Sequence, residues 1–401
     1  MATEEEEEEE ATAVVSGEED EELDISNSDV CTKYREAAKI ANLALQGIIL
    51  QAKAGTKVVD LCKFGDSVIN QKCAAIYTKK VKGKIIEKGI AFPTCISLNE
   101  CASHFCPLES DTQIVLKAGD MVKADVGCHV DGYASVAAHT FIIPSEEENA
   151  NISGPQADVM SAAHIAAEVA IKLLQPGNTN SQITQAIAKV ADSYGVSAVA
   201  GVLSHRMKRF VIDGNKVIIL KEDVDQKVET FTFETNEVYS IDIVMSTGDG
   251  KLREAEQRAT VFKRAVDKNY RLKMRASRNL FSEVNLKYPA LPFTLRHFDD
   301  ERQARMGVVE CIKHELLHTY PVLYAKQGDL LCQYKFTVLI LPSGPTRITG
   351  LPSFGDLKLT SDKELDPELA TIMAQAAKKK KKKPRKKNTT TSGITEDAAD
   401  D

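Results

Sequence analysis

A carboxylate that could bind a metal lies in a predicted hairpin at residues 121–143. Two strand-like runs flank Asp131-Gly132, and Asp-Gly between such runs is a strong type I′ turn signal. In that register Asp125 and position 136 are diagonal neighbours on one face of the sheet. Two carboxylates there could hold two divalent ions about 3.5–4 Å apart. Position 136 is valine, however, and a lone buried aspartate on a strand is by default a hydrogen-bonded structural residue.

A second candidate is the run from His314 to His318, which reads H-E-x-x-H and matches the zincin pattern. Histidines four residues apart on a helix can share a zinc ion. The apolar residues around the run predict an amphipathic helix, and no obvious third ligand follows it. A structural helix is therefore the preferred interpretation.

Cysteines form a third candidate. Cys101, His104 and Cys106, with Cys95 upstream, could suggest zinc, but their spacing fits no common structural zinc site. The chain has nine cysteines, and no basic or apolar leader precedes its acidic start. We therefore expect buried free thiols in a reducing compartment rather than disulfides.

Hydrophobic periodicity predicts two helix pairs that position these groups. The first pair starts near residue 29, with Ser28 as a candidate N-cap, and its second helix covers about 58–77. The second pair covers 157–174 and a stretch around 183–190. Each pair precedes a β-rich stretch with one histidine, His104 or His205. The pattern indicates a diverged internal duplication in an α/β chain.

Later segments add strands and a charged insert. Strands are expected at 237–245 and 330–341, and the stretch 251–320 between them is expected to be mostly helical. Residues 251–278 contain ten Lys or Arg against three acidic residues. Interleaved aromatic residues, such as Tyr270, modestly favour RNA binding over a merely solvated surface.

Five ordered blocks resemble type-2 methionine aminopeptidases: FPTCISLNECASH (92–104), KADVGCHVDGYASVAAHTF (123–141), GVLSH (201–205), EVYSIDI (237–243) and CQYKFTVLILP (332–342). A closer resemblance, carried by SHRMKRFVIDG, RMGVVECIKHELL, QYKFTVLILP and the Lys-rich tail, is to the proliferation-associated, ErbB-receptor-binding protein family. Members of that family are non-peptidase relatives of the aminopeptidases. The resemblance implies the α/β pita-bread fold, with a pseudo-duplicated core, over roughly residues 29–360.

The resemblance also locates the enzyme's site in this chain. The active enzymes use Asp, Asp, His, Glu and Glu as metal ligands, which fall here on Asp125, Val136, His205, Asp242 and Lys335. The substrate-assisting histidine falls on His104, and a second substrate-site histidine falls on Asp213. Leu369 to Met373 falls where related proteins carry an LxxLL-like helix, with Ile and Met replacing the last two leucines.

Loss of the metal site follows from the chemistry of these replacements. Two divalent ions bring four positive charges and need several carboxylates close by. Valine donates nothing, and the ammonium of Lys335 puts a positive charge where an anion was required. We therefore expect no metal, no cofactor and no peptidase activity, and we expect Lys335 to pair with Asp125 or Asp242 in place of the metal. An active dinuclear aminopeptidase is the alternative.

Charge is distributed unevenly along the 401 residues. Residues 1–28 carry thirteen acidic groups and no basic ones, whereas residues 374–401 carry nine basic and four acidic groups. We expect an acidic disordered tail at 1–28, a pita-bread domain at 29–365 and a basic disordered tail at 366–401. The acidic tail is either a solubilising segment or a competitor for basic surfaces. No apolar run of membrane-spanning length occurs.

Two basic elements are the candidate RNA contacts. The resemblance implies binding to rRNA, to the large ribosomal subunit or to pre-ribosomes, with roles in translation, rRNA processing and transcription, in cytoplasm, nucleus and nucleolus. Receptor cytoplasmic domains and transcription corepressors are implied protein partners. A protein-protein adaptor that uses the vacated cleft is a further alternative. The candidate residues are Arg264, Lys268, Arg271, Lys273, Arg275 and Arg278 in the insert, and Lys378, Lys379, Lys380, Lys381, Lys382, Lys383, Arg385, Lys386 and Lys387 in the tail.

Overall fold

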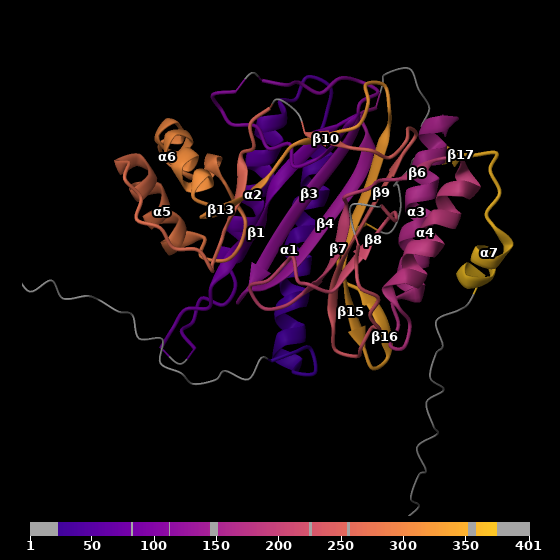
Figure 1. Ribbon diagram of the computed structural model, residues 1–401, viewed down its shortest axis with the longest axis horizontal. Helices are drawn as coiled ribbons and strands as arrows, with labels where there is room; N and C mark the ends of the chain where they lie inside the picture. Colours follow the sequence, from indigo (N-terminus) through magenta and orange to yellow (C-terminus); the bar gives the residue numbers. More distant parts are fainter. Residues whose placement is uncertain are drawn as a thin grey trace, which may run out of the picture.

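The computed structural model of the chain describes residues 23–81, 83–111, 113–144, 151–223, 227–254, 257–351 and 358–374. Its centre is a nine-stranded sheet in the order β1-β3-β4-β15-β9-β7-β8, with β16 beside β15 and β6 beside β9 (Figure 1). The strands are β1 (Lys88–Leu98), β3 (Met121–Val130), β4 (Tyr133–Ile142), β6 (Ser197–Ala198), β7 (Leu203–Met207), β8 (Val217–Ile219), β9 (Val238–Ser246), β15 (Leu331–Leu341) and β16 (Gly344–Arg347).

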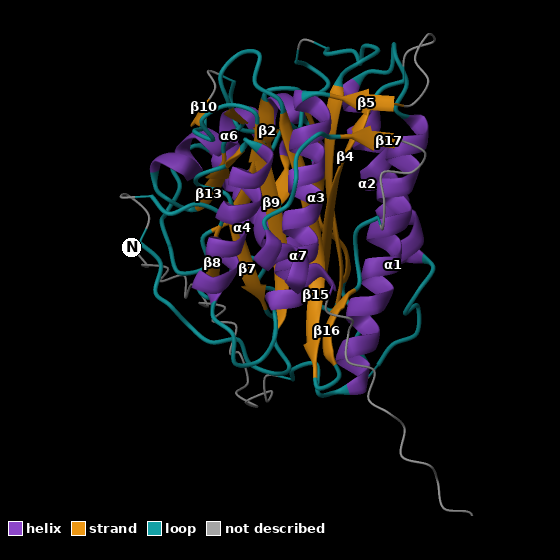
Figure 2. Cartoon of the chain, turned by 90° about the vertical axis from the view of Figure 1, so that its right-hand side faces the viewer, coloured by secondary structure: helices purple, strands orange, loops and turns teal. Residues whose placement is uncertain are grey.

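Two helix pairs cover the sheet, one pair on each half. Helices α1 (Ser28–Gln51) and α2 (Val58–Ala74) pack on β1, β3 and β4, whereas α3 (Pro155–Leu173) and α4 (Asn180–Tyr194) belong to the half built on β9 and β15 (Figure 2). The expected helices and the strands at 237–245 and 330–341 are therefore confirmed. One cap differs, because the side chain of Asn27, and not Ser28, accepts the N-terminal hydrogen bond of α1.

Strand alternation sends one set of side chains to the helices and the other set to the opposite face. On β3 the even-numbered residues join the hydrophobic core beneath α1 and α2. The odd-numbered residues, which include Asp125, therefore face away from these helices. The turn at Asp131-Gly132 has positive φ at both residues, 57° and 75°, as a type I′ turn requires. The predicted hairpin register is confirmed, with Asp125 opposite Ala138.

The insert between β9 and β15 is less helical than the sequence indicated. It contains α5 (Arg275–Lys287), α6 (Glu301–Lys313) and the short helix η1 (Leu295–His297), together with β10 (Arg253–Glu254), β11 (Val261–Arg264), β12 (Phe293–Thr294), β13 (Leu317–Tyr320) and β14 (Leu323–Tyr324). The expectation of a mostly helical stretch was wrong, because short runs such as those at β11 and β13 pair as strands. Helices α5 and α6 pack together around a small core of their own, away from α3 and α4 (Figure 1).

Short elements complete the fold. Strand β2 (Cys101–Ser103) pairs with β14, and β5 (Asn151–Ser153) pairs in parallel with β17 (Lys358–Thr360). Helix α7 (Pro367–Ala374) lies within the stretch that the sequence analysis assigned to the basic tail. Its Leu369 is 1% exposed and joins the core beneath α3 and α4. The described structure therefore continues past the expected boundary at residue 365. Within the described ranges, no helix is both long and apolar enough to cross a membrane.

Candidate functional site

One row of the sheet carries the charged residues of the site. Asp125 on β3 lies opposite Ala138 on β4, Ala138 lies opposite Lys335 on β15, and Lys335 lies opposite Asp242 on β9. Alanine at the position between Asp125 and Lys335 leaves the long lysine side chain room to cross one strand. The row thus brings together three residues that are far apart in sequence, on the face turned away from the helices.

Lys335 forms ion pairs with both aspartates. Its ammonium nitrogen lies 2.5 Å from a carboxylate oxygen of Asp125 and 3.1 Å from one of Asp242. The expected pairing of Lys335 with these carboxylates is therefore confirmed. Asp242 also accepts a hydrogen bond from the amide of Gln333, at 2.9 Å. We did not foresee Gln333 from the sequence, although its position two residues before Lys335 on the same strand puts it on the same face.

Burial governs the ionisation of the site. It raises the pKa of Asp125 to about 6, although the charge of Lys335 opposes the rise. The two carboxylates outweigh the burial of Lys335 and raise the pKa of its ammonium above the ordinary value. Within the described part of the chain, the second carboxylate oxygen of Asp125 is buried without a hydrogen-bond partner. Three charges, two negative and one positive, are therefore held in a poorly hydrated place.

Two histidines face the same cleft and are neutral. His104 has its Nδ1 3.0 Å from the carbonyl of Pro321, and His205 has its Nδ1 3.1 Å from the carbonyl of Gly214. A carbonyl only accepts, so each Nδ1 carries the proton. Burial lowers the pKa of His104 to about 4 and also lowers the pKa of His205.

The cleft above this row is small and mostly apolar. Its volume is about 200 Å³, and Val136, His104, His205 and Lys335 are among its lining residues. Asp213 lies at the same cleft and pairs with Lys263 of the insert, with Nζ–Oδ2 2.7 Å. The insert is thereby joined electrostatically to the second half of the domain.

The side chains of this row are a poor fit to a pair of divalent ions. The ammonium of Lys335 lies between the two carboxylates that would have to bridge or hold the metals, and like charges repel there. Val136 brings only methyl groups to the cleft. Across the part of the chain that the structure describes, no cluster of three or more His, Cys, Asp or Glu side chains could hold a metal ion.

The basic residues of the insert do not all have the same freedom. The guanidinium of Arg278 donates to the carbonyls of Leu272 and Lys273, and that of Arg264 lies over the Phe281 ring at 5.7 Å. Arg278 thus holds the loop before α5, and Arg264 lies against α5 itself. Exposed side chains are those of Arg278 and of Lys268, Arg271, Lys273 and Arg275. The ammonium of Lys268 lies 3.5 Å from a carboxylate oxygen of Glu315. Lys378 to Lys387 of the tail lie outside the described residues.

The zincin interpretation finds no support in the fold. Helix α6 ends at Lys313, His314 is its C-cap, and His318 lies on strand β13. The two histidines are therefore not one turn apart on a helix, and the expected continuous helix through Leu317 was wrong. The ring of His314 instead stacks on Tyr270, with centroids 3.5 Å apart.

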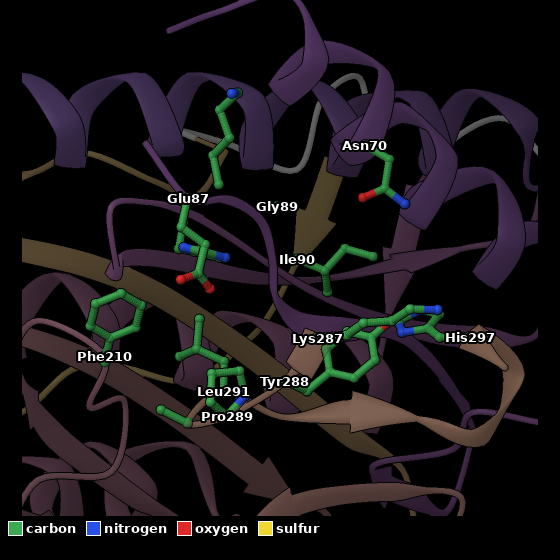
Figure 3. A pocket seen from close by; sticks show the side chains of 13 residues that line it. Asn70, Glu87, Gly89, Ile90, Phe210, Lys287, Tyr288, Pro289, Leu291 and His297 are labelled. Atoms are coloured by element: carbon green, nitrogen blue, oxygen red, sulfur yellow. The ribbon is translucent and has the colours of Figure 1, made fainter. Parts of the chain in front are cut away.

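A separate cavity of about 430 Å³ lies at the start of β1, away from the charged row. Figure 3 shows Glu87, Ile90, Tyr288 and Leu291 around it. The cavity lies between the first residues of β1 and the segment that follows α5. No sequence pattern predicts this cavity, since its residues come from α2, β1, β3 and loops without a shared motif.

Comparison with known proteins gives the family. Residues 32–259 match the model of metallopeptidase family M24. The chain is 48% identical over 361 residues to ErbB-3 binding protein 1 of Solanum tuberosum, covering 90% of this chain and 91% of that one. It is 47% identical over 327 residues to proliferation-associated protein A of Dictyostelium discoideum, covering 82% and 83%. The chain belongs to the ErbB-3-binding, proliferation-associated family of M24 proteins.

A solved structure extends the comparison for this ErbB-3-binding family member. A thermophilic Arx1 has a TM-score of 0.82 with 30% identity, over 88% of this chain and 100% of that one. The expected pita-bread α/β fold of the M24 proteins is confirmed. The family match spans both helix pairs and the strands that carry Asp125, His205 and Asp242.

Proposed function

We propose that this protein is a non-catalytic M24 scaffold that binds RNA and ribosomal particles and thereby regulates growth-linked translation. The proposal that the protein is non-catalytic rests on the ion pairs of Lys335 with Asp125 and Asp242. Metallopeptidases use metal ions to generate hydroxide and to polarise the scissile carbonyl. An ammonium cannot do either, because it has no vacant coordination position and its pKa is raised by the two carboxylates.

RNA binding is supported by the distribution of positive charge. Lys268, Arg271, Lys273 and Arg275 are exposed on a loop and helix start that the folded insert holds in place. Fixed charges can match the phosphates of a shaped RNA, whereas the run Lys378 to Lys387 offers a dense charge for salt-sensitive attraction. We propose that the insert contributes preference among RNAs and the tail contributes general affinity, with rRNA of the large subunit or of pre-ribosomes as the target.

A titration of RNA binding at several salt concentrations tests this proposal. Arg271, Lys273 and Arg275 are replaced together by alanine, and Arg278 is kept because it holds the preceding loop. Each lost phosphate contact should lower the log–log salt slope by about 0.7–0.9, so the triple variant should lose about 2–3 units. It should lose structured-RNA and ribosome affinity but still bind homopolymers through the tail.

Controls separate this effect from total charge. A matched variant replaces three exposed lysines elsewhere, Lys53, Lys57 and Lys79, and should bind as the wild type does. Deleting residues 378–387 should flatten the salt dependence without changing the preference among RNAs. If the combined loss of tail and insert charges leaves RNA and ribosome association unchanged, the nucleic-acid proposal fails and the adaptor alternative replaces it.

Protein partners are a further part of the proposal. The relatives named ErbB-3 binding protein support a receptor cytoplasmic domain as a partner, and transcription corepressors remain candidates. The basic run Lys378 to Lys387 is also typical of a nuclear or nucleolar address, which agrees with proposed sites of action in cytoplasm, nucleus and nucleolus. Pull-down of the receptor domain with and without nuclease separates direct contact from contact through RNA.

A further inference from the structure

Three buried thiols meet an arginine where the insert joins the body. Cys62 of α2, Cys95 of β1 and Cys106 after β2 are at most 1% exposed. Cys95 and Cys106 belong to one hydrophobic cluster, and both other thiols influence the pKa of Cys106. The three residues come from separate elements, so the fold and not a local motif brings them together.

A guanidinium faces the sulfur of Cys106. Arg296 Nη1 lies 3.1 Å from Cys106 Sγ, and the Thr294 hydroxyl lies 3.5 Å from the same sulfur. Arg296 also binds Asp66, at 2.5 Å, which fixes the direction of its side chain. Burial opposes ionisation, but hydrogen bonds from the neighbouring thiols and the charge of Arg296 outweigh it and hold the pKa of Cys106 well below its ordinary value. A thiolate at this place is a nucleophile.

Cys106 is 1% exposed, and the residue lies in the wall of a groove. This groove of about 590 Å³ lies between the body and α6, with Thr260, Leu295 and Val309 also among its lining residues. Hydrogen peroxide is about the size of two water molecules, so a groove of this volume can hold it. Cys311 and Cys332 lack this combination, because burial raises the pKa of each thiol to about 12.

Cys95 is placed to react with an oxidised Cys106. The chain turns at residues 99–100 between β1 and β2, and the segment after the turn therefore runs back along β1. The backbone N–H of Ile96 donates to the carbonyl of Phe105, at 2.9 Å, across these two segments. Cys95 and Cys106 are the next pair along these segments. Directly opposed residues of antiparallel segments have Cα atoms about 4.5–5.5 Å apart, within the range that disulfides span.

We propose that Cys106 is a modification site for hydrogen peroxide and that Cys95 resolves the oxidised form as a disulfide. The thiolate attacks one oxygen of the peroxide, the O–O bond breaks, and the departing hydroxide takes up a proton to become water. Sulfur is oxidised by two electrons to a sulfenic acid and the peroxide is reduced. The Cys95 sulfur then attacks the sulfenic sulfur, the S–O bond breaks and a second water leaves. Two thiols and one peroxide thus yield one disulfide and two waters.

Mass spectrometry of the full-length protein tests the proposal. The reduced protein is exposed to a small excess of hydrogen peroxide and then digested without reductant. The expected product is a Cys95–Cys106 disulfide with the loss of two hydrogens. In Cys95→Ser, dimedone should trap a sulfenic acid at Cys106, and in Cys106→Ser the Cys95 thiol should stay reduced. In the wild type, Cys106 should react about tenfold faster than Cys311 or Cys332.

The treated protein carries its own control. Cys73 and Cys128 have their sulfurs 3.5 Å apart in the core. The Cys128 thiol lowers the pKa of Cys73, but neither residue lines the groove beside α6. This pair should remain reduced while Cys95 and Cys106 are joined. Equal oxidation of both pairs, or a Cys106 that reacts no faster than Cys311, would overturn the proposal. A Cys62–Cys106 disulfide would overturn the assignment of Cys95. If a serine variant does not fold, the disulfides identified in the treated wild-type protein decide between these outcomes.

Discussion

Replacing Lys335 by methionine tests the central feature of the candidate site. Methionine keeps the length and the apolar stem of the side chain but removes the ammonium. That ammonium lies 2.5 Å and 3.1 Å from oxygens of Asp125 and Asp242. Its side chain is 14% exposed, and those of the two aspartates are 7% and 10% exposed. The variant therefore leaves two mutually repelling carboxylates buried without a counter-charge.

The expected loss can be worked from these distances. At an effective dielectric constant of about 20, each contact is worth roughly 5–7 kcal/mol of Coulomb attraction. The cost of dehydrating the ammonium offsets several kcal/mol of this sum. Removing one partner of a buried pair costs about 3–5 kcal/mol, because the remaining charge is uncompensated. We therefore expect Lys335→Met to lower the free energy of unfolding by about 3–5 kcal/mol.

Urea unfolding followed by circular dichroism measures the loss, since the chain has no tryptophan. The matched control is Lys326→Met, which removes a 2.8 Å ion pair with Asp249 whose side chains are 56% and 40% exposed. Solvent screens that pair, so the control should unfold like the wild type. An unchanged midpoint for Lys335→Met would refute the reasoning, because it would mean that the ammonium is solvated and does not neutralise the aspartates.

Three further predictions follow from the same structure. Because the pKa of Asp125 is raised to about 6, its stabilising contribution is present at low pH and is lost as pH rises through 6. Without Lys335 that pKa rises further, so the loss of unfolding free energy in Lys335→Met should shrink by at least about 1 kcal/mol between pH 7 and pH 5.5. A loss that stays constant over this pH range would contradict the prediction. Gly132→Ala should destabilise the protein by about 1–3 kcal/mol, and by more than Gly119→Ala. Both glycines have positive φ, but only at Gly132 would a Cβ lie 2.6 Å from the Phe210 ring. Equal melting temperatures of the two variants would count against this prediction. Removing residues 1–22, which hold twelve acidic groups, should raise RNA affinity at low salt and have little effect at high salt, and a filter-binding titration that shows no change at low salt would exclude competition by that segment.

The charged row shows how far sequence reasoning reaches. Asp-Gly at 131–132 determines the hairpin register, and that register puts Asp125 opposite Ala138 as predicted. The strand that pairs with β4 cannot be predicted in the same way. No local sequence pattern indicates that β15, about two hundred residues later, lies beside β4. The resemblance to the aminopeptidases placed Lys335 at the same site as Asp125, and the pairing of β15 with β4 agrees with that placement. Gln333 and the alanine that gives Lys335 its path emerge only from the three-dimensional register.

The insert shows where local patterns mislead. Val308 to Leu317 has apolar spacing typical of one helix, yet α6 ends at Lys313 and Leu317 begins β13. The helix ends there because Leu316 and Leu317 are buried in the core of the insert, and β13 pairs with β11. Glu310 likewise has a role that spacing does not predict, since it accepts from the backbone N–H of Lys273 and Met274 at the start of α5. Such contacts depend on which helices pack against each other, and no local sequence pattern predicts that packing.

Metal content measured together with peptide hydrolysis tests the account most directly. The purified full-length protein is incubated with Co²⁺, Mn²⁺ or Zn²⁺, freed of loose metal by gel filtration, and analysed for bound ions and for release of methionine from Met-initiated peptides. With Lys335 between Asp125 and Asp242 and valine at position 136, we expect no stoichiometric metal pair and no released methionine. Two tightly held ions per chain with turnover of the peptide would contradict the account, because the ammonium would then have to leave the carboxylates on which the proposal depends.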